Sequence, residues 1–191
     1  MHGTFNGLGH KITGIRYNSN NRSIFGYVQY STIKNLAVVC TMTGLRQGAL
    51  YYNGLDVSID NVYIDATFAE TASCCGGICD VGFGSLTVSN SLILTKGFET
   101  QSVAETCGAM IARDSASVKL KNTYMISDGK ICSEIVDGAN KNSTTRNATK
   151  DVLFENESNF VAAIQKGTVS FEGYNYFWNL SGEMPGFKSL T

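Results

Sequence analysis

Aspartates in one short stretch are the first residues that offer chemistry in this sequence. Asp56, Asp60 and Asp65 lie within ten positions of one another. In a strand, Asp56 and Asp60 would share a face, and stacked strands about 4.8 Å apart would bring in carboxylates from neighbouring repeats. Two carboxyl groups held about 5 to 10 Å apart are the pair that cleaves a glycosidic bond. The stretch is therefore a candidate catalytic region, although exposed acids on an outward face are the favoured explanation.

Tyrosines flank these carboxylates and suggest a binding site instead of a catalytic one. A tyrosine ring offers a flat apolar face for a sugar, and neighbouring Asp and Asn side chains can bind its hydroxyl groups. The candidate ligand-binding residues are Tyr51, Tyr52, Asp56, Asp60, Tyr63 and Asp65. Because side chains alternate along a strand, half of these tyrosines are expected to point into the core.

Six cysteines form the second group of reactive side chains. The run CCGGIC at 74–79 has no matching His/Cys pair, and both histidines lie at the N-terminal end. We therefore expect no metal site and no cysteine nucleophile. Stacked repeats would bring equivalent cysteines within disulfide range, so we predict at least one disulfide, with reduced core cysteines as the alternative. The disulfide candidates are Cys74, Cys75, Cys107 and Cys132.

The glycine-rich opening TFNGLGHKITGI, residues 4–15, is not predicted to bind phosphate. A nucleotide-binding loop lies between a strand and a helix. Only six residues precede Gly7, and the residues after Gly9 alternate as in a strand. Both are predicted to be turn glycines, and we expect no cofactor.

The elements that must position these side chains are short strands in repeated units. Apolar residues alternate in runs bounded by Gly, Asn and Ser, and helical periodicity is nearly absent. Six similar runs, each around a central Asn or Gly, are found at 31–38, 57–64, 86–93, 118–125, 152–159 and 169–176. This repetition predicts an all-β fold, a right-handed parallel β-helix (solenoid) of about six coils with irregular loops. A β-sandwich is the alternative.

The central asparagines have a structural role in such a solenoid. Asn tolerates the left-handed backbone of a tight corner, and its amide can bind the equivalent amide one coil away. The predicted Asn ladder consists of Asn35, Asn61, Asn90, Asn122 and Asn156.

The chain is predicted to be one domain with three parts. Residues 1–23 form an opening coil or N-terminal cap, residues 24–178 form the repeated coils, and residues 179–191 form a closing segment. A polar stretch at 137–151 is predicted to be a long exposed loop. It carries Asn142 and Asn147, the Asn-x-Ser/Thr positions most open to glycosylation.

The amino-acid composition excludes some classes of binding partner. Charged residues make up 16% of the chain and the formal net charge is −1, so there is no basic surface for nucleic acid. No apolar run is long enough to insert into a membrane, and no signal peptide is visible. Since Met1 directly precedes a motif typical of the middle of a fold, we expect the chain to be a fragment of a larger exported protein.

Three segments resemble a known family. TFNGLGHKITGI and the following SIFGYVQYSTIKNLAV, residues 23–38, are similar to the GLUG-type repeats of bacterial and protist surface proteins. The matching residues are Phe5, Gly7, Gly9, His10 and Ile12, then Phe25, Gly26, Val28, Ile33, Asn35 and Leu36. The segment FWNLSGEMPGFKSL, 177–190, looks like the family's closing piece. The resemblance implies a cell-surface or secreted β-helix, often adhesin-like, with no defined catalytic residues.

These observations predict a non-enzymatic, extracellular or cell-surface β-helix module that binds a glycan or a surface protein. One alternative is a carbohydrate-active β-helix that uses the region of Asp56, Asp60 and Asp65. A second alternative is a structural unit that self-assembles end to end, because an open coil end has unpaired strand edges.

Overall fold

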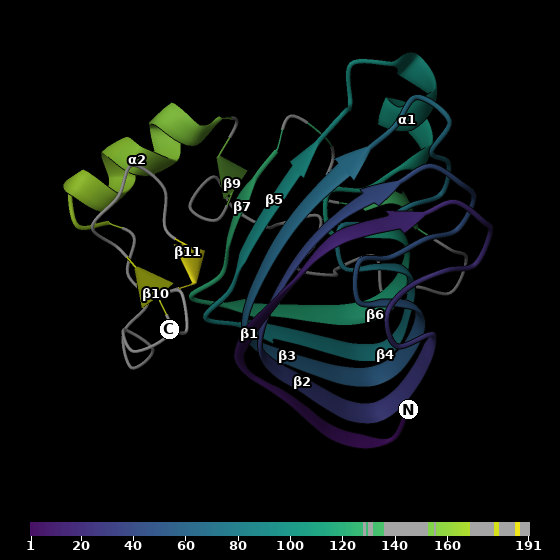
Figure 1. Ribbon diagram of the computed structural model, residues 1–191, viewed down its shortest axis with the longest axis horizontal. Coiled ribbons are helices and arrows are strands. Elements are labelled where there is room, and N and C mark those ends of the chain that lie inside the picture. The colour runs from purple at the N-terminus through teal and green to yellow at the C-terminus, as the bar shows by residue number, and fades with distance from the viewer. Residues whose placement is uncertain are drawn as a thin grey trace.

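Successive turns of the chain stack as parallel strands, so that the backbone winds into a β-solenoid (Figure 1). The computed structural model describes residues 1–127, 129, 132–135, 153, 154, 156–168, 178, 179, 186 and 187. The strands are β1 (Gly3–Tyr17), β2 (Tyr27–Met42), β3 (Tyr51–Phe68), β4 (Cys79–Ser89), β5 (Leu92–Lys96), β6 (Ile111–Lys121), β7 (Tyr124–Ile126), β8 (Cys132–Ile135), β9 (Leu153–Phe154), β10 (Trp178–Asn179) and β11 (Gly186–Phe187). The helices are α1 (Gln101–Thr106) and α2 (Glu157–Gln165).

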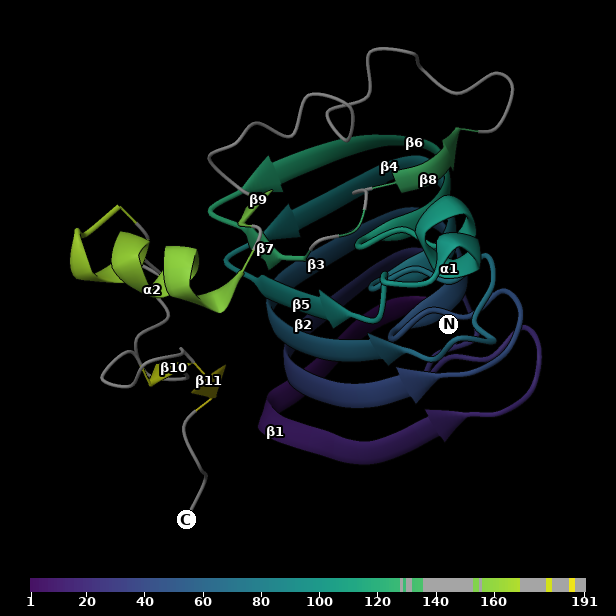
Figure 2. The same cartoon turned by 90° about the horizontal axis from the view of Figure 1, so that it is seen from above.

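All pairings among β1 to β9 are parallel, and only β10 and β11 pair antiparallel. The predicted right-handed parallel β-helix is therefore confirmed. The β-sandwich alternative is wrong, because its sheets would be antiparallel. β3 pairs with both β4 and β5 because the corner at Asn90 divides the equivalent strand of the next turn. Figure 2 shows the turns stacked from β1 upward.

The described residues form about four turns instead of the predicted six. The fifth repeated run, 152–159, contributes only β9 before helix α2 begins. Asn156 is extended, with φ −153°, and its side chain accepts the N–H of Asn159 at 3.0 Å. It is thus the N-cap of α2 and not a rung of the Asn ladder. The sixth run, 169–176, lies outside the described residues, as does the predicted loop 137–151.

The other four ladder asparagines occupy equivalent corners. Asn35, Asn61, Asn90 and Asn122 all have left-handed backbones, with φ between 49° and 54°. Asn61 donates to Oδ1 of Asn35 at 2.8 Å, and Asn122 donates to Oδ1 of Asn90 at 3.0 Å. The ladder predicted from the sequence is confirmed at these positions.

The ladder has one break, which the sequence did not indicate. The amide of Asn90 donates to Oδ1 of Asp60 at 2.8 Å and bypasses Asn61. Oδ1 of Asn61 instead accepts the indole N–H of Trp178. The break therefore anchors a residue 117 positions further along the chain to the wall of the solenoid.

Stacked glycines allow the tight bend that precedes β3, β4 and β6. Gly48 bridges to Gly76, and Gly76 bridges to Gly108, so the three lie above one another. A Cβ on Gly76 would overlap the carbonyl oxygen of Cys79. The small residues that open these segments are thus required by the close approach of the backbone.

Two apolar clusters stabilise the fold. The larger cluster fills the interior of the solenoid. The smaller cluster lies on the outer face of β5 and β7, where four side chains point away from the interior: Leu92, Leu94, Tyr124 and Ile126. Phe160 of α2 and Trp178 cover them. Helix α2 lies beside this face in both views (Figures 1 and 2).

The opening and closing segments predicted from the sequence can be compared with the described residues. Residues 1–23 include β1, a full strand of the first turn, and most of the closing segment 179–191 lies outside the described residues. Neither described helix has the length and apolar character of a membrane span.

Candidate functional site

The two aspartates predicted to act as a pair are both occupied in holding turns together. Asp56 lies at a left-handed corner with φ 52°, and its Oδ1 accepts the N–H and the hydroxyl of Ser85 at 2.9 and 2.8 Å. Oδ1 of Asp60 accepts the hydroxyl of Ser89 at 2.7 Å and the amide of Asn90 at 2.8 Å. Each carboxylate binds the turn that follows it, so the structure gives both a structural role.

Three further candidates lie in or beside apolar clusters. Tyr51 is completely buried in the interior, where its ring lies against Gly54. Tyr63 contacts the ring of Trp178 edge-on, with centroids 6.2 Å apart. Asp65 is close to Tyr63, and burial raises the pKa of its carboxyl group, while Lys96 and Lys11 oppose that shift. The six candidates therefore do not form one site.

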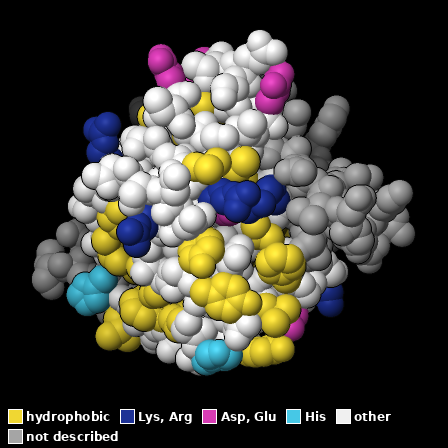
Figure 3. All heavy atoms as spheres, turned by 90° about the vertical axis from the view of Figure 1, so that its right-hand side faces the viewer, with side chains coloured by type: hydrophobic (Ala, Val, Ile, Leu, Met, Phe, Trp, Pro, Cys, Tyr) yellow, Lys and Arg dark blue, Asp and Glu magenta, His cyan; other side chains and the backbone are white. Residues whose placement is uncertain are grey.

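Of the six candidates, only Tyr52 belongs to a hydrophobic surface that the sequence analysis did not predict. We define the aromatic face as Tyr27, Tyr30, Tyr52, Leu55 and Phe83. Tyr30, Tyr27 and Phe83 are 64%, 41% and 40% exposed, and the other two are partly buried. These residues lie on the side of the solenoid where β2, β3 and β4 begin, and Figure 3 shows hydrophobic side chains gathered there.

Strand register assembles the aromatic face. Gln29, Leu55 and Phe83 are direct partners in three successive turns. Tyr27 and Asn53 are partners two residues earlier in the same strands. These residues precede the left-handed corner at which Tyr30 has φ 47°. The backbone thus presents side chains from β2, β3 and β4 in one outward surface.

Polar groups border the aromatic rings. Gln29 donates its amide N–H to the hydroxyl of Tyr27 at 2.8 Å. The buried Oδ1 of Asn53 has no hydrogen-bond partner within the described part of the chain. Arg113 of β6 forms two hydrogen bonds to the fully buried Asp80 of β4, of 2.9 and 2.6 Å. The guanidinium and carboxylate therefore neutralise each other beside the aromatic face.

The sequence signal for this surface was weak. Tyr27 and Tyr30 occur together in YVQY, but the period-2 rule cannot indicate that both point outward. Tyr30 does so only because its backbone is left-handed, a conformation uncommon outside Gly, Asn and Asp.

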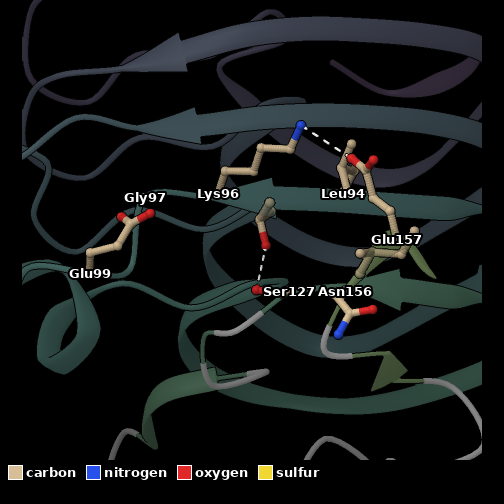
Figure 4. Close-up of a pocket in the computed structure, with 9 residues that line it drawn as sticks. Leu94, Lys96, Gly97, Glu99, Ser127, Asn156 and Glu157 are labelled. Carbon is tan, nitrogen blue, oxygen red and sulfur yellow. Dashed lines mark hydrogen bonds and ion pairs between the residues drawn. The ribbon is translucent and has the colours of Figure 1, made fainter. Parts of the chain in front are cut away.

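A cleft of about 280 Å³ lies beside the start of α2 (Figure 4). Leu94 and Ile126 provide its apolar lining. Nζ of Lys96 points toward Glu157, 3.4 Å from Oε1, and Glu99 lies apart from this pair (Figure 4). The cleft therefore combines a cation with two carboxylates, none of which was among the predicted site residues.

The cysteines do not form the predicted disulfide among the described residues. Cys40, Cys74, Cys75, Cys79 and Cys107 are free thiols, and the side chain of Cys132 is outside the described part. Cys75 and Cys107 do lie together in adjacent turns, where Sγ of Cys107 accepts the N–H of Cys75 at 3.4 Å. The prediction that stacked turns bring these cysteines together is confirmed, but both are free thiols.

The remaining predictions concern positions or groups that the structure does not place. Asn142 and Asn147 lie outside the described residues. Within the described residues, no three His, Cys, Asp or Glu side chains come together as metal ligands.

Comparisons with protein-family models, with curated proteins and with solved structures give no match to this chain.

Proposed function

We propose that this chain is a non-catalytic binding module of a cell-surface or secreted protein, and that it presents an outer surface of the solenoid to a glycan or protein ligand. The observation that carries the proposal is the aromatic face, where Tyr27, Tyr30 and Phe83 are all exposed. The resemblance to GLUG-type surface proteins supports the exported location.

Physical reasons favour a ligand on this face. Exposed aromatic side chains lose contact with water when a ligand covers them, which is a large source of binding energy. The rings stand on hydrogen-bonded strands of three turns. A surface that is already ordered loses little conformational entropy on binding.

The positions of Asp56 and Asp60 support a non-catalytic role. Each side chain accepts two hydrogen bonds from the next turn. A catalytic pair needs carboxyl groups that face a common substrate, whereas these groups hold the backbone corners.

The proposal can be tested with a panel of soluble polysaccharides and immobilised extracellular proteins. Gel retardation or surface capture would measure binding, and the same samples would be assayed for new reducing ends, with and without Ca²⁺. We expect binding without new ends. New ends would show an enzyme, and absence of binding to every ligand would count against a binding module.

One specific observation keeps the carbohydrate-active alternative as a second candidate. The cleft beside α2 contains Glu99 and Glu157, and Asp65 with its raised carboxyl pKa lies near Lys96. A raised carboxyl pKa is a feature of a general acid. If new ends appear in the panel, Glu157→Gln should abolish them, and a fully active variant would exclude this cleft.

End-to-end self-assembly is the third candidate. The outer edge of β1 has no partner strand among the described residues. The pairing of β1 with β2 contains two register shifts, and β1 carries Lys11 and Arg16. Irregularity and charge are features that protect a strand edge from further pairing, so binding is preferred to assembly. Sedimentation at increasing protein concentration would detect assembly as a rising mass.

A further inference from the structure

The geometry points to an uncharged glycan chain as the ligand of the aromatic face, stacked on the rings of Tyr27, Tyr30 and Phe83. This inference rests on the proposed function and makes it specific, because it names the surface and the class of ligand. It follows from the size of the surface, its charge and its polar groups.

The size of the surface suits a sugar chain better than a folded protein. Tyr27 lies on β2 and Phe83 on β4, and β3 lies between these strands. Since neighbouring strands are about 4.8 Å apart, β2 and β4 are about 10 Å apart. From residue 27 to residue 30 the strand also advances about 10 Å. The platform is therefore on the order of 100 Å², whereas a standard protein interface buries about 800 Å² on each partner.

The charge of the surroundings favours an uncharged ligand. Two cations lie beside the face: Arg113 is bound through two nitrogens to Asp80, and the N-terminal ammonium of Met1 donates to the backbone carbonyl of Tyr27 at 2.6 Å. Asp56, at the corner in β3, has Oδ1 engaged by Ser85. Since Asp80 already neutralises Arg113, and the carboxylate of Asp56 repels anions, an acidic ligand would gain little attraction here.

The polar groups around the rings match the hydroxyl groups of a sugar. The amide of Gln29 has two N–H donors and an acceptor oxygen. Among the described residues, this side chain makes only the bond to the Tyr27 hydroxyl. Asn53 is in register with Tyr27, and its Oδ1 lacks a partner within the described part of the chain. Aromatic rings that alternate with amides can bind both the C–H face and the hydroxyl groups of one sugar.

The test uses affinity electrophoresis of the full chain in gels that contain one polysaccharide each. The neutral probes are dextran, galactomannan and hydroxyethyl cellulose, and the acidic probe is polygalacturonate. The variants are Tyr27→Ala, Phe83→Ala and the double variant. Leu8→Ala is the matched control, because Leu8 is an exposed hydrophobic residue, 62% accessible, outside the aromatic face.

We expect at least one neutral polysaccharide to retard the wild-type protein and the Leu8→Ala control equally, with no loss at high salt. The double variant should bind about thirtyfold more weakly than the wild type, since each of the two aromatic contacts contributes on the order of 1 kcal/mol and about 1.4 kcal/mol corresponds to a factor of ten. Unchanged far-UV circular dichroism would show that these exposed substitutions leave the fold intact.

Other outcomes overturn the inference and are distinguishable from a failure of the proposed function. Equal retardation of the double variant and the wild type would place glycan binding on another surface, with the binding function retained. Retardation by polygalacturonate alone, lost at high salt, would show a charged ligand. If no polysaccharide retards the wild type, the inference of a glycan ligand is wrong. Capture of the chain by immobilised proteins then decides whether it is a binding module.

Discussion

Replacing Asn61 by alanine removes the side chain that links the solenoid wall to the C-terminal segment. Asn61 is fully buried and donates to Oδ1 of Asn35 at 2.8 Å. It also accepts the indole N–H of Trp178. Its backbone is left-handed, with φ 54°. The substitution therefore acts on one buried and one partly buried hydrogen bond, and on a corner that alanine adopts poorly.

The expected loss of stability is about 3 kcal/mol. Each of the two hydrogen bonds contributes about 1 kcal/mol, and the buried indole N–H of Trp178 cannot recover its bond from water. Alanine in the left-handed region adds about 1 kcal/mol.

Asn122→Ala is the matched control, since it shares the chemistry and backbone of Asn61 without the burial. Asn122 has φ 51°, donates to Oδ1 of Asn90 at 3.0 Å and accepts the hydroxyl of Tyr124 at 3.1 Å, but it is only partly buried. Water can replace both hydrogen bonds, so mainly the backbone cost of about 1 kcal/mol remains. The two variants should therefore differ by about 2 kcal/mol.

Urea unfolding provides the measurement, followed by far-UV circular dichroism and by the fluorescence of Trp178. Trp178 is the only tryptophan in the chain and is 1% exposed, so its emission reports its own burial. In Asn61→Ala the emission should move to longer wavelength before global unfolding. If Asn61→Ala costs no more than Asn122→Ala, or if its emission is that of the wild type, the proposed anchor does not exist.

Three further predictions concern charge, pH and thiols. Arg113→Ala should destabilise by about 3 kcal/mol or more because it removes the charged partner of buried Asp80; adding Asp80→Asn should restore part of the loss, and an additive double variant would contradict the pairing. Burial raises the pKa of Cys40 to about 12 from 9.0, so the folded state keeps a proton that the unfolded state loses between these pH values. Stability should thus fall by about 1.4 kcal/mol per pH unit in that window, and Cys40→Ala should remove this part of the slope in urea titrations. In native protein under non-reducing conditions, the partly exposed Cys74 should be alkylated before the buried Cys75. The protein is then unfolded without reductant, alkylated and weighed by mass spectrometry. Fewer than five modified cysteines would reveal a disulfide that involves one of the five free thiols.

Much of the fold could be predicted because its signal is local and repeated. Each turn repeats a corner asparagine together with alternating apolar residues. These two signals together specify stacked turns, with corners at Asn35, Asn61, Asn90 and Asn122. The count of turns was wrong because Asn156 carries the same local pattern yet begins a helix. An Asn before a polar residue suits an N-cap as well as a corner, so the pattern alone does not decide between them.

The candidate site was less predictable, since binding residues need outward exposure and proximity. The sequence singled out Tyr51 and Tyr52 equally, but the turn buries Tyr51 completely and leaves Tyr52 partly exposed. Asp56 and Asp60 were plausible catalytic residues until the position of the next turn showed that Ser85 and Ser89 bind them.

The sequence by itself determined that this chain winds into parallel turns with asparagine corners, because periodicity and left-handed tolerance are properties of single residues and their neighbours. Only the tertiary structure decided which side chains meet. The register of β2, β3 and β4 brings Tyr27 and Phe83 onto one surface, although 56 positions separate them in the sequence. The interruption of the ladder at Asn61 likewise brings Trp178 to the solenoid wall. Such contacts depend on how whole turns stack, and no local pattern records that alignment.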